Sequence, residues 1–163
     1  MKDLILTGFM GSGKSRVGRL LAQKLGWPFV EMDAEIERWA GKPVTRIFDE
    51  DGEPAFRQME SALVEDLCAD RQAGLPRVIA TGGGALVDPA NRARMLARGT
   101  VVCLQVEAAE SLRRLGQQAA VERPLLRGAD AQARVQELLT QRQGAYQAIP
   151  WQVDTTGLAP AEV

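Results

Sequence analysis

Short apolar runs alternate along this chain with longer stretches in which apolar residues recur every three or four positions. The short runs have the length and composition of β-strands, and they lie at residues 3–7, 29–33, 78–81, 100–106 and 151–154. The longest of them, 100–106, predicts a fully buried central strand. Strands that alternate with helices favour a parallel sheet with helices on both faces, and therefore an α/β fold.

The stretches between the strands have the periodicity of amphipathic helices. Residues 52–71, for example, place Phe56, Met59, Leu63 and Leu67 on one stripe. The predicted helices span residues 16–25, 34–40, 52–71, 88–96, 108–115 and 131–148, with a short helical or irregular turn at 44–48. Pro160-Ala161-Glu162 resembles the first turn of a further helix, so we expect the C-terminal helix to be truncated at Val163.

One loop has a sequence that predicts its ligand. Gly8 to Ser15 has the spacing G-x-x-x-x-G-K-[ST], and it lies between a predicted strand and a predicted helix. The glycines allow successive backbone N–H groups to face an anion, and the helix adds its N-terminal amides. Lys14 is expected at the β- and γ-phosphates of a nucleotide, and the Ser15 hydroxyl at Mg²⁺. The motif predicts nucleotide phosphate binding but does not specify the reaction.

Composition narrows the class of protein. The chain has 163 residues, a net charge of −1 and no histidine, which indicates a single domain that uses neither imidazole catalysis nor imidazole metal ligands. The near-neutral charge and few aromatic residues argue against nucleic acid as a partner. We find no membrane span and no signal region, and we expect a cytoplasmic protein. Cys68 and Cys103 are expected to be reduced core residues.

Acidic residues lie at the C-terminal end of the second predicted strand, at the edge of the sheet where ligands bind. Asp33 has two interpretations: the N-cap of the next helix, or the acceptor that orients a substrate hydroxyl toward the γ-phosphate. Glu31 lies two residues earlier, on the same face of the pleat, and could hold Mg²⁺ through water.

Other candidates for a second substrate also have structural alternatives. Arg57 has Glu53 and Glu60 one turn away on either side, which fits either a surface ion-pair ladder or an anion clamp. Gly82-Gly83-Gly84, directly after the third strand, fits a tight turn or close approach of the backbone to a ligand. Arg123 lies in the long polar segment 116–130 and could reach a transferring phosphoryl group, whereas Arg142 could simply belong to a solvated helix face.

Taken together, these blocks resemble shikimate kinase in order and spacing. The resemblance covers essentially the whole chain and rests on Gly8 to Ser15, Glu31-Met32-Asp33, residues 56–60, Gly82 to Ala85, residues 123–126 and Arg142. It implies a three-layer P-loop fold like that of nucleoside monophosphate kinases, with five parallel strands in the order 2-3-1-4-5 and a lid at about residues 112–128. It also implies a substrate-binding subregion at about residues 33–61 and a protein that is a monomer.

The same resemblance implies an activity: ATP phosphorylates the 3-hydroxyl of shikimate with Mg²⁺, in the chorismate pathway to aromatic amino acids. Asp33 then activates the hydroxyl, Arg57 and Arg142 grip the carboxylate, and the glycine run lines the site. The residues implied at ATP are Gly11, Ser12, Gly13, Lys14, Ser15, Arg16, Arg114 and the lid residue Arg123. The residues implied at the metal are Ser15 and Glu31.

These residues suggest direct, in-line transfer without a phosphoenzyme. Lys14, Ser15-bound Mg²⁺, the loop amides and Arg123 would neutralise the γ-phosphoryl group while Asp33 positions the nucleophile. Two alternatives remain open. One is a related kinase that acts on gluconate, and the other is a non-catalytic nucleotide-binding module that regulates a partner.

Overall fold

The structure is a computed structural model, and it describes residues 2–69, 74–116, 124–126 and 130–163. At its centre is a five-stranded parallel sheet in the order β2-β3-β1-β4-β5, as the resemblance implied. The strands are β1 (Asp3–Gly8), β2 (Phe29–Glu31), β3 (Val78–Ala80), β4 (Gly99–Gln105) and β5 (Trp151–Asp154).

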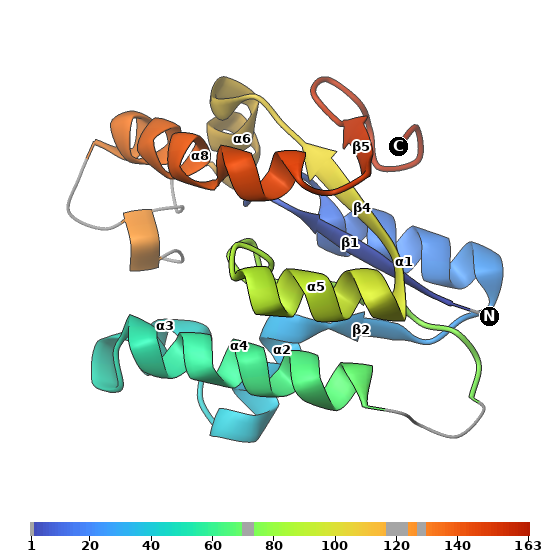
Figure 1. Cartoon of the computed structure of the whole chain (residues 1–163). Helices are drawn as coiled ribbons and strands as arrows, with labels where there is room; N and C mark the ends of the chain where they lie inside the picture. The colour runs from blue at the N-terminus through green and yellow to red at the C-terminus, as the bar shows by residue number, and fades with distance from the viewer. Residues whose placement is uncertain (1, 70–73, 117–123, 127–129) are drawn as a thin grey trace.

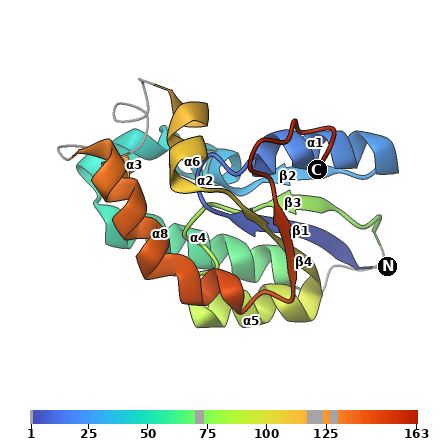
Figure 2. The same cartoon turned by 90° about the horizontal axis from the view of Figure 1, so that it is seen from above.

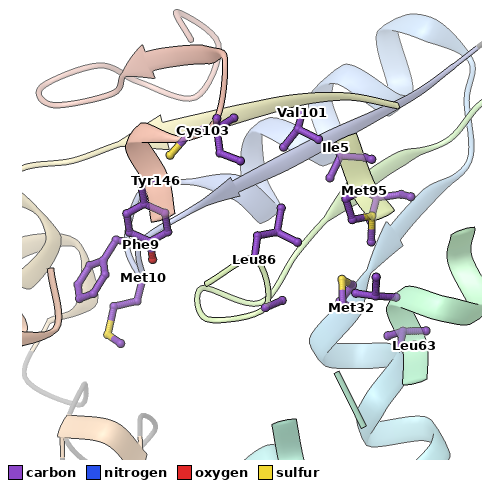
Figure 3. Packing of buried hydrophobic residues seen from close by; sticks show 14 of the residues in the cluster. Ile5, Phe9, Met10, Met32, Leu63, Leu86, Met95, Val101, Cys103 and Tyr146 are labelled. Carbon is purple, nitrogen blue, oxygen red and sulfur yellow. The ribbon is translucent and has the colours of Figure 1, made fainter. Parts of the chain in front are cut away.

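Helices cover both faces of the sheet (Figures 1 and 2). The helix α1 (Lys14–Leu25) packs on one face, and α4 (Glu53–Cys68), α5 (Pro89–Arg98) and α8 (Ala131–Gln147) lie against the other. Alternation along β1 explains the two layers, because neighbouring side chains of a strand point to opposite faces. Leu6 packs with Val17 of α1, whereas Ile5 belongs to the core cluster that includes Leu63 and Met95 (Figure 3).

The remaining elements gather where the parallel strands end. They are α2 (Met32–Ala40), α3 (Val44–Glu50), α6 (Ala108–Leu115) and the 3₁₀ turn η1 (Pro124–Leu126). Figure 2 shows α2, α3 and α6 at the end of the molecule toward which the strands point. The loops that follow the strands therefore meet at one edge, which is where ligands bind in sheets of this kind.

Local chemistry sets several helix ends. The Asp88 side chain accepts hydrogen bonds from Ala90 N (2.7 Å) and Asn91 N (3.0 Å), and Pro89 occupies the first turn, as the sequence predicted. Asp130 caps α8 in the same way through Gln132 N at 2.9 Å. These caps satisfy amides that a helix leaves without partners.

Three expectations about individual elements are wrong. Asp33 is not a helix N-cap: β2 ends at Glu31 and α2 begins at Met32, so Asp33 lies inside the first turn of the helix. The strand and the helix join without a loop, so Glu31 and Asp33 do not share one face of a pleat. β4 is an interior strand, paired with β1 and β5, but it is not fully buried, because Thr100 and Gln105 are exposed. β1 is the middle strand of the sheet, because two strands lie on either side of it.

The amino-terminal end of β1 holds a buried ion cluster. Asp3 is 2% exposed, and its carboxylate accepts hydrogen bonds from Arg77 N (2.9 Å), Arg77 Nη2 (2.7 Å) and Arg98 Nε (3.1 Å). Burial alone would raise the pKa of Asp3, but the hydrogen bonds and charges of the two arginines outweigh it and lower that pKa below its ordinary value. The cluster joins β1 to the segment before β3 and to the end of α5.

A search of the described segments for helices long and apolar enough to cross a bilayer found none.

Candidate active site

The glycine-rich loop joins β1 to α1, as its sequence predicted. Gly8, Gly11 and Gly13 have positive φ angles of 135°, 75° and 98°, which residues with a Cβ rarely adopt. Lys14 Nζ donates to the carbonyl oxygens of Gly8 and Phe9, both at 2.9 Å. The lysine ammonium therefore lies folded over the start of the loop, within reach of any anion that the loop binds.

The side chains of Ser15 and Glu31 are in contact beside this loop. The Ser15 hydroxyl donates to Glu31 Oε1, and Arg19 Nη2 is 2.9 Å from Glu31 Oε2. The serine comes from the first turn of α1 and the glutamate from the end of β2. Hydroxyl and carboxylate oxygens are ligands that Mg²⁺ prefers.

Gly82 to Gly84, the glycine run after β3, has no side chains, and charged side chains pack directly against its backbone. We call this surface the glycine floor. A Cβ on Gly82 would lie 2.5 Å from Glu60 Oε1 and 2.9 Å from Asp33 Oδ1, and a Cβ on Gly84 would lie 2.5 Å from Arg57 Nη1. Side chains at these positions would clash with the acids and the guanidinium. The run therefore allows close approach and is more than a tight turn.

Arg57 forms both of the ion pairs that its sequence neighbours predicted. Nη1 is 2.5 Å from Glu60 Oε2, and Nη2 is 2.9 Å from Glu53 Oε1. The Glu53 side chain is 47% exposed, whereas that of Glu60 is 2% exposed, so this is not a ladder on the surface. The pairs orient the guanidinium beside the glycine floor.

Glu60 is a site residue that sequence reasoning treated only as a neighbour of Arg57. Burial raises the pKa of Glu60 above its ordinary value; Arg57 opposes this effect, and the nearby Asp33 carboxylate adds to it. Its Oε1 atom is buried and accepts no hydrogen bond from the described residues. The available signal was position, because Glu60 falls on the buried stripe of α4 with Phe56 and Leu63.

Arg142 is buried, so its interpretation as part of a solvated helix face is wrong. It is 7% exposed, and its guanidinium carbon lies 5.8 Å from the centre of the Phe9 ring. One turn later on α8, the Tyr146 hydroxyl donates to Gly83 O at 2.6 Å. Burial raises the pKa of Tyr146 to about 12, so the phenol stays a donor at neutral pH. Phe9 and Tyr146, which lie together in Figure 3, were not among the sequence candidates.

Several cavities lie along this edge of the sheet among the described residues, and four of them are lined by candidate site residues. A cavity of about 320 Å³ is lined by Lys14, Ser15, Glu31, Asp33 and Gly83, among others. A smaller pocket of about 70 Å³ is lined in part by Asp33, Arg57, Glu60, Gly82 to Gly84 and Arg142. A third cavity of about 340 Å³ shares Arg57, Glu60, Gly84, Leu125 and Arg142 with that pocket. The candidate anion-binding and acceptor residues thus line adjoining spaces.

The fourth cavity lies on the other side of the glycine-rich loop. Its volume is about 520 Å³, and its lining includes Gly11, Ser12, Gly13, Ser15, Arg16 and Arg114. Arg114 Nη1 also donates to Gly11 O and to Thr155 Oγ1, both at 3.1 Å. Arg123 lies outside the described residues, so its role stays a prediction.

Comparison with protein families and solved structures gives this arrangement a context. A family model described as shikimate kinase matches residues 10–163. The chain belongs to the shikimate kinase family. The shikimate kinase of Desulforudis audaxviator is 47% identical over 155 residues, covering 95% of this chain and 78% of that protein. The shikimate kinase of Thermodesulfovibrio yellowstonii is 37% identical over 163 residues, covering 100% and 91%.

Solved structures agree with the family assignment. Shikimate kinase from Acinetobacter baumannii, solved in complex with shikimate, superposes with a TM-score of 0.91 at 33% identity and covers 99% of this chain and 88% of that one. A gluconokinase from Sinorhizobium meliloti superposes with a TM-score of 0.58 at 20% identity, covering 99% of this chain and 86% of that one. At that identity the likeness to the gluconokinase shows a shared fold alone.

Proposed function

We propose that this protein transfers the γ-phosphoryl group of Mg-ATP to the 3-hydroxyl of shikimate, giving shikimate 3-phosphate and ADP in the chorismate pathway. The observation that supports this most is the small pocket in which Asp33, Arg57 and Arg142 meet over the glycine floor, next to the phosphate loop. Shikimate has one carboxylate and several hydroxyls. Two guanidinium groups suit the carboxylate, and a short acid suits a hydroxyl.

The nucleotide is assigned to the loop between β1 and α1. The amides of Gly11 to Ser15 and the Lys14 ammonium bind its phosphates, as expected at the N-terminus of a helix. Arg16 and Arg114 line the cavity of about 520 Å³, which has room for the remainder of the nucleotide. Arg123 is proposed to meet ATP from the lid, at about residues 112–128 of the single domain.

The magnesium ion is assigned to the neighbourhood of Ser15 and Glu31. The hydroxyl and the carboxylate offer oxygen ligands of the kind that this ion prefers, and they line the same cavity as Lys14 and Asp33. When bound, the ion supplies positive charge at the β- and γ-phosphate oxygens.

Transfer is proposed to be direct and in line. Asp33 accepts the hydrogen bond of the 3-hydroxyl and orients its oxygen toward the γ-phosphorus. Lys14 and the loop amides stabilise charge on the transferring group, and Arg57 and Arg142 fix the ring by its carboxylate. Glu60 holds Arg57 through the ion pair at 2.5 Å, so it acts on the substrate through that arginine.

The test is ADP release by the purified protein with each of several acceptors. We expect release that depends on shikimate and Mg²⁺ together, with inorganic phosphate release near background. Activity on gluconate alone would reject the substrate. ATP binding without stimulation by any acceptor would favour a regulatory nucleotide-binding module.

A monomeric state and a cytoplasmic location accompany the proposal. Light scattering after size-exclusion chromatography tests the first, and fractionation of cells that produce the protein tests the second.

A further inference from the structure

Side chains from distant segments hold the carbonyl oxygens of the phosphate loop from outside. Beyond the two carbonyls bound by Lys14, the next three residues of the loop each have a donor of their own. These contacts are Ser111 Oγ to Met10 O at 2.9 Å, Arg114 Nη1 to Gly11 O at 3.1 Å and Thr155 Oγ1 to Ser12 O at 3.0 Å. The Thr155 hydroxyl also lies 2.9 Å from Gln105 O, so its single proton is shared between the two carbonyl oxygens.

Each of these hydrogen bonds, which we call tethers, also fixes the direction of a backbone amide. In a trans peptide the C=O of one residue points opposite to the N–H of the next residue. The bond from Ser111 therefore turns the Gly11 N–H away from α6, and the bond from Thr155 turns the Gly13 N–H away from the loop after β5. Gly11 and Gly13 have φ angles of 75° and 98°, and glycine allows such peptides to rotate more freely than other residues do. The tethers supply a restraint that the loop sequence lacks.

The two hydroxyl groups are buried and come from different elements. Ser111 lies on α6 and is 0% exposed, and Thr155 follows β5 and is 1% exposed. A Cβ on Gly11 would lie 3.2 Å from Ser111 Oγ, so α6 packs directly on the loop, beside which Figure 2 shows it. Water cannot easily replace a lost hydroxyl here, and the abandoned carbonyl would favour a rotated peptide.

We propose that Ser111 and Thr155 are positioning residues for the triphosphate of the nucleotide. They act through the Met10–Gly11 and Ser12–Gly13 peptides, whose amides they keep directed toward the anion. On this proposal neither hydroxyl contacts the phosphates, although Thr155 also lines the cavity of about 520 Å³. The inference rests on the proposed function of this loop in binding ATP, and it assigns part of that affinity to residues 101 and 143 positions away from the peptides that they hold.

The experiment measures binding of inorganic tripolyphosphate and of ADP by calorimetry, using the full chain and no turnover. We expect Ser111→Ala to weaken the binding of both ligands about fivefold to tenfold, the effect of one lost hydrogen bond. Thr155→Val should weaken it at least as much, because this variant also loses the contacts of Thr155 Oγ1 with Gln105 O and Arg114 Nη1. Shikimate affinity, measured separately, should stay within twofold of the wild type. Ser111→Ala raises intrinsic helix propensity, so a loss of affinity in that variant cannot come from a weaker α6.

Three further variants separate positioning from general stability. Thr155→Ser keeps the hydroxyl and should bind tripolyphosphate like the wild type. Thr140→Val removes an exposed hydroxyl that bonds to Gln136 O at 2.9 Å, and Val101→Ala destabilises the core on β4; both should keep wild-type affinity. Wild-type affinity in Ser111→Ala and Thr155→Val, or equal losses in Val101→Ala, would overturn the inference. Failure of the wild type to bind tripolyphosphate would instead overturn the proposed function.

Discussion

Two buried carboxylates lie at opposite ends of the sheet and differ in how completely they are paired. Asp3, at the amino end, is bound by both Arg77 and Arg98, and its pKa is lowered. Glu60, at the carboxyl end, binds Arg57 through one oxygen, while its other oxygen is buried without a hydrogen bond from any described residue, and its pKa is raised. The first arrangement stabilises the ionised acid. In the second arrangement, burial of the partly paired Glu60 carboxylate lowers the stability of the fold.

The difference separates an ion pair that supports the fold from one that prepares a site. Buried charges cost free energy unless their partners and hydrogen bonds compensate for desolvation. Asp3 has that compensation, whereas Glu60 also faces the Asp33 carboxylate across Gly82. Strained electrostatics of this kind is typical of functional sites, where binding a ligand relieves it.

The largest effect is expected at Asp33, the acid that shares the carboxyl end with Glu60. Asp33→Asn removes the proposed acceptor for the substrate hydroxyl while nearly preserving its shape. We expect kcat to fall about 10²- to 10⁴-fold, the range for loss of a general base, with nucleotide affinity little changed. Steady-state kinetics and ADP binding measure the two effects. Undiminished turnover would remove Asp33 from the chemistry.

Asp3→Asn should have the opposite effect to Asp33→Asn: it should lower stability and leave catalysis unchanged. The neutral amide leaves Arg77 and Arg98 with a weaker partner, so we expect the free energy of unfolding to fall by about 3 kcal/mol. This value is the lower end of the range for a broken buried ion pair, because the Arg98 side chain is 30% exposed. The KM for shikimate should not change. Urea unfolding, together with kinetics at a temperature where the variant is folded, tests this. A raised KM with normal stability would contradict the assignment of Asp3 to the fold and of Glu60 to the site.

Glu60→Gln should change binding more than stability. The amide keeps a hydrogen bond to Arg57 but loses the charge that orients the guanidinium, so we expect the KM for shikimate to rise about tenfold. Stability at neutral pH should equal or exceed that of the wild type, because a buried ionised acid is removed. Urea unfolding and initial rates measure both. A stability loss as large as that of Asp3→Asn would make Glu60 a structural residue.

The smallest effect is on the pH dependence of stability, and the two acids give opposite signs. The folded pKa of Asp3 lies below its ordinary value of 3.8, so its contribution is complete above that value and is lost as pH falls through the folded pKa. The folded pKa of Glu60 lies above its ordinary value of 4.5, so its penalty is complete above the folded pKa and disappears as pH falls to 4.5.

Unfolding of the wild type and both variants between pH 3 and pH 7 would measure this difference. The advantage of the wild type over Asp3→Asn should shrink only at the acid end of the range. The wild type should gain stability relative to Glu60→Gln as pH falls toward 4.5. Curves that move in the same direction would mean that the two acids have equivalent environments.

The phosphate loop and the strand order were predictable from the sequence, for different reasons. The loop is local, since glycines, a lysine and a serine at fixed spacing specify the conformation and the ligand together. The strand order followed from the resemblance, because alternation of strands and helices fixes a parallel sheet but not which strands pair. The boundary at Asp33 was missed because a strand that passes directly into a helix leaves no turn residue to mark it.

The supporting contacts of the site were not predictable. Burial of Arg142 and Glu60 depends on how α8 and α4 approach the glycine run, which no single segment encodes. The same is true of Ser111, an ordinary helix residue until α6 meets the phosphate loop. At Glu60 the local signals were an acid on the apolar stripe of a helix and an arginine one turn earlier, which gave its partner Arg57 but not its burial against Gly82.

The bond between Thr155 and Ser12 joins residues that are 143 positions apart. During translation the phosphate loop is made before Thr155, so the loop precedes the hydroxyl that bonds to its Ser12 carbonyl. A nascent chain would therefore carry the complete motif long before that motif is rigid. Nucleotide affinity would therefore rise about fivefold to tenfold when β5 joins the sheet and Thr155 reaches the loop.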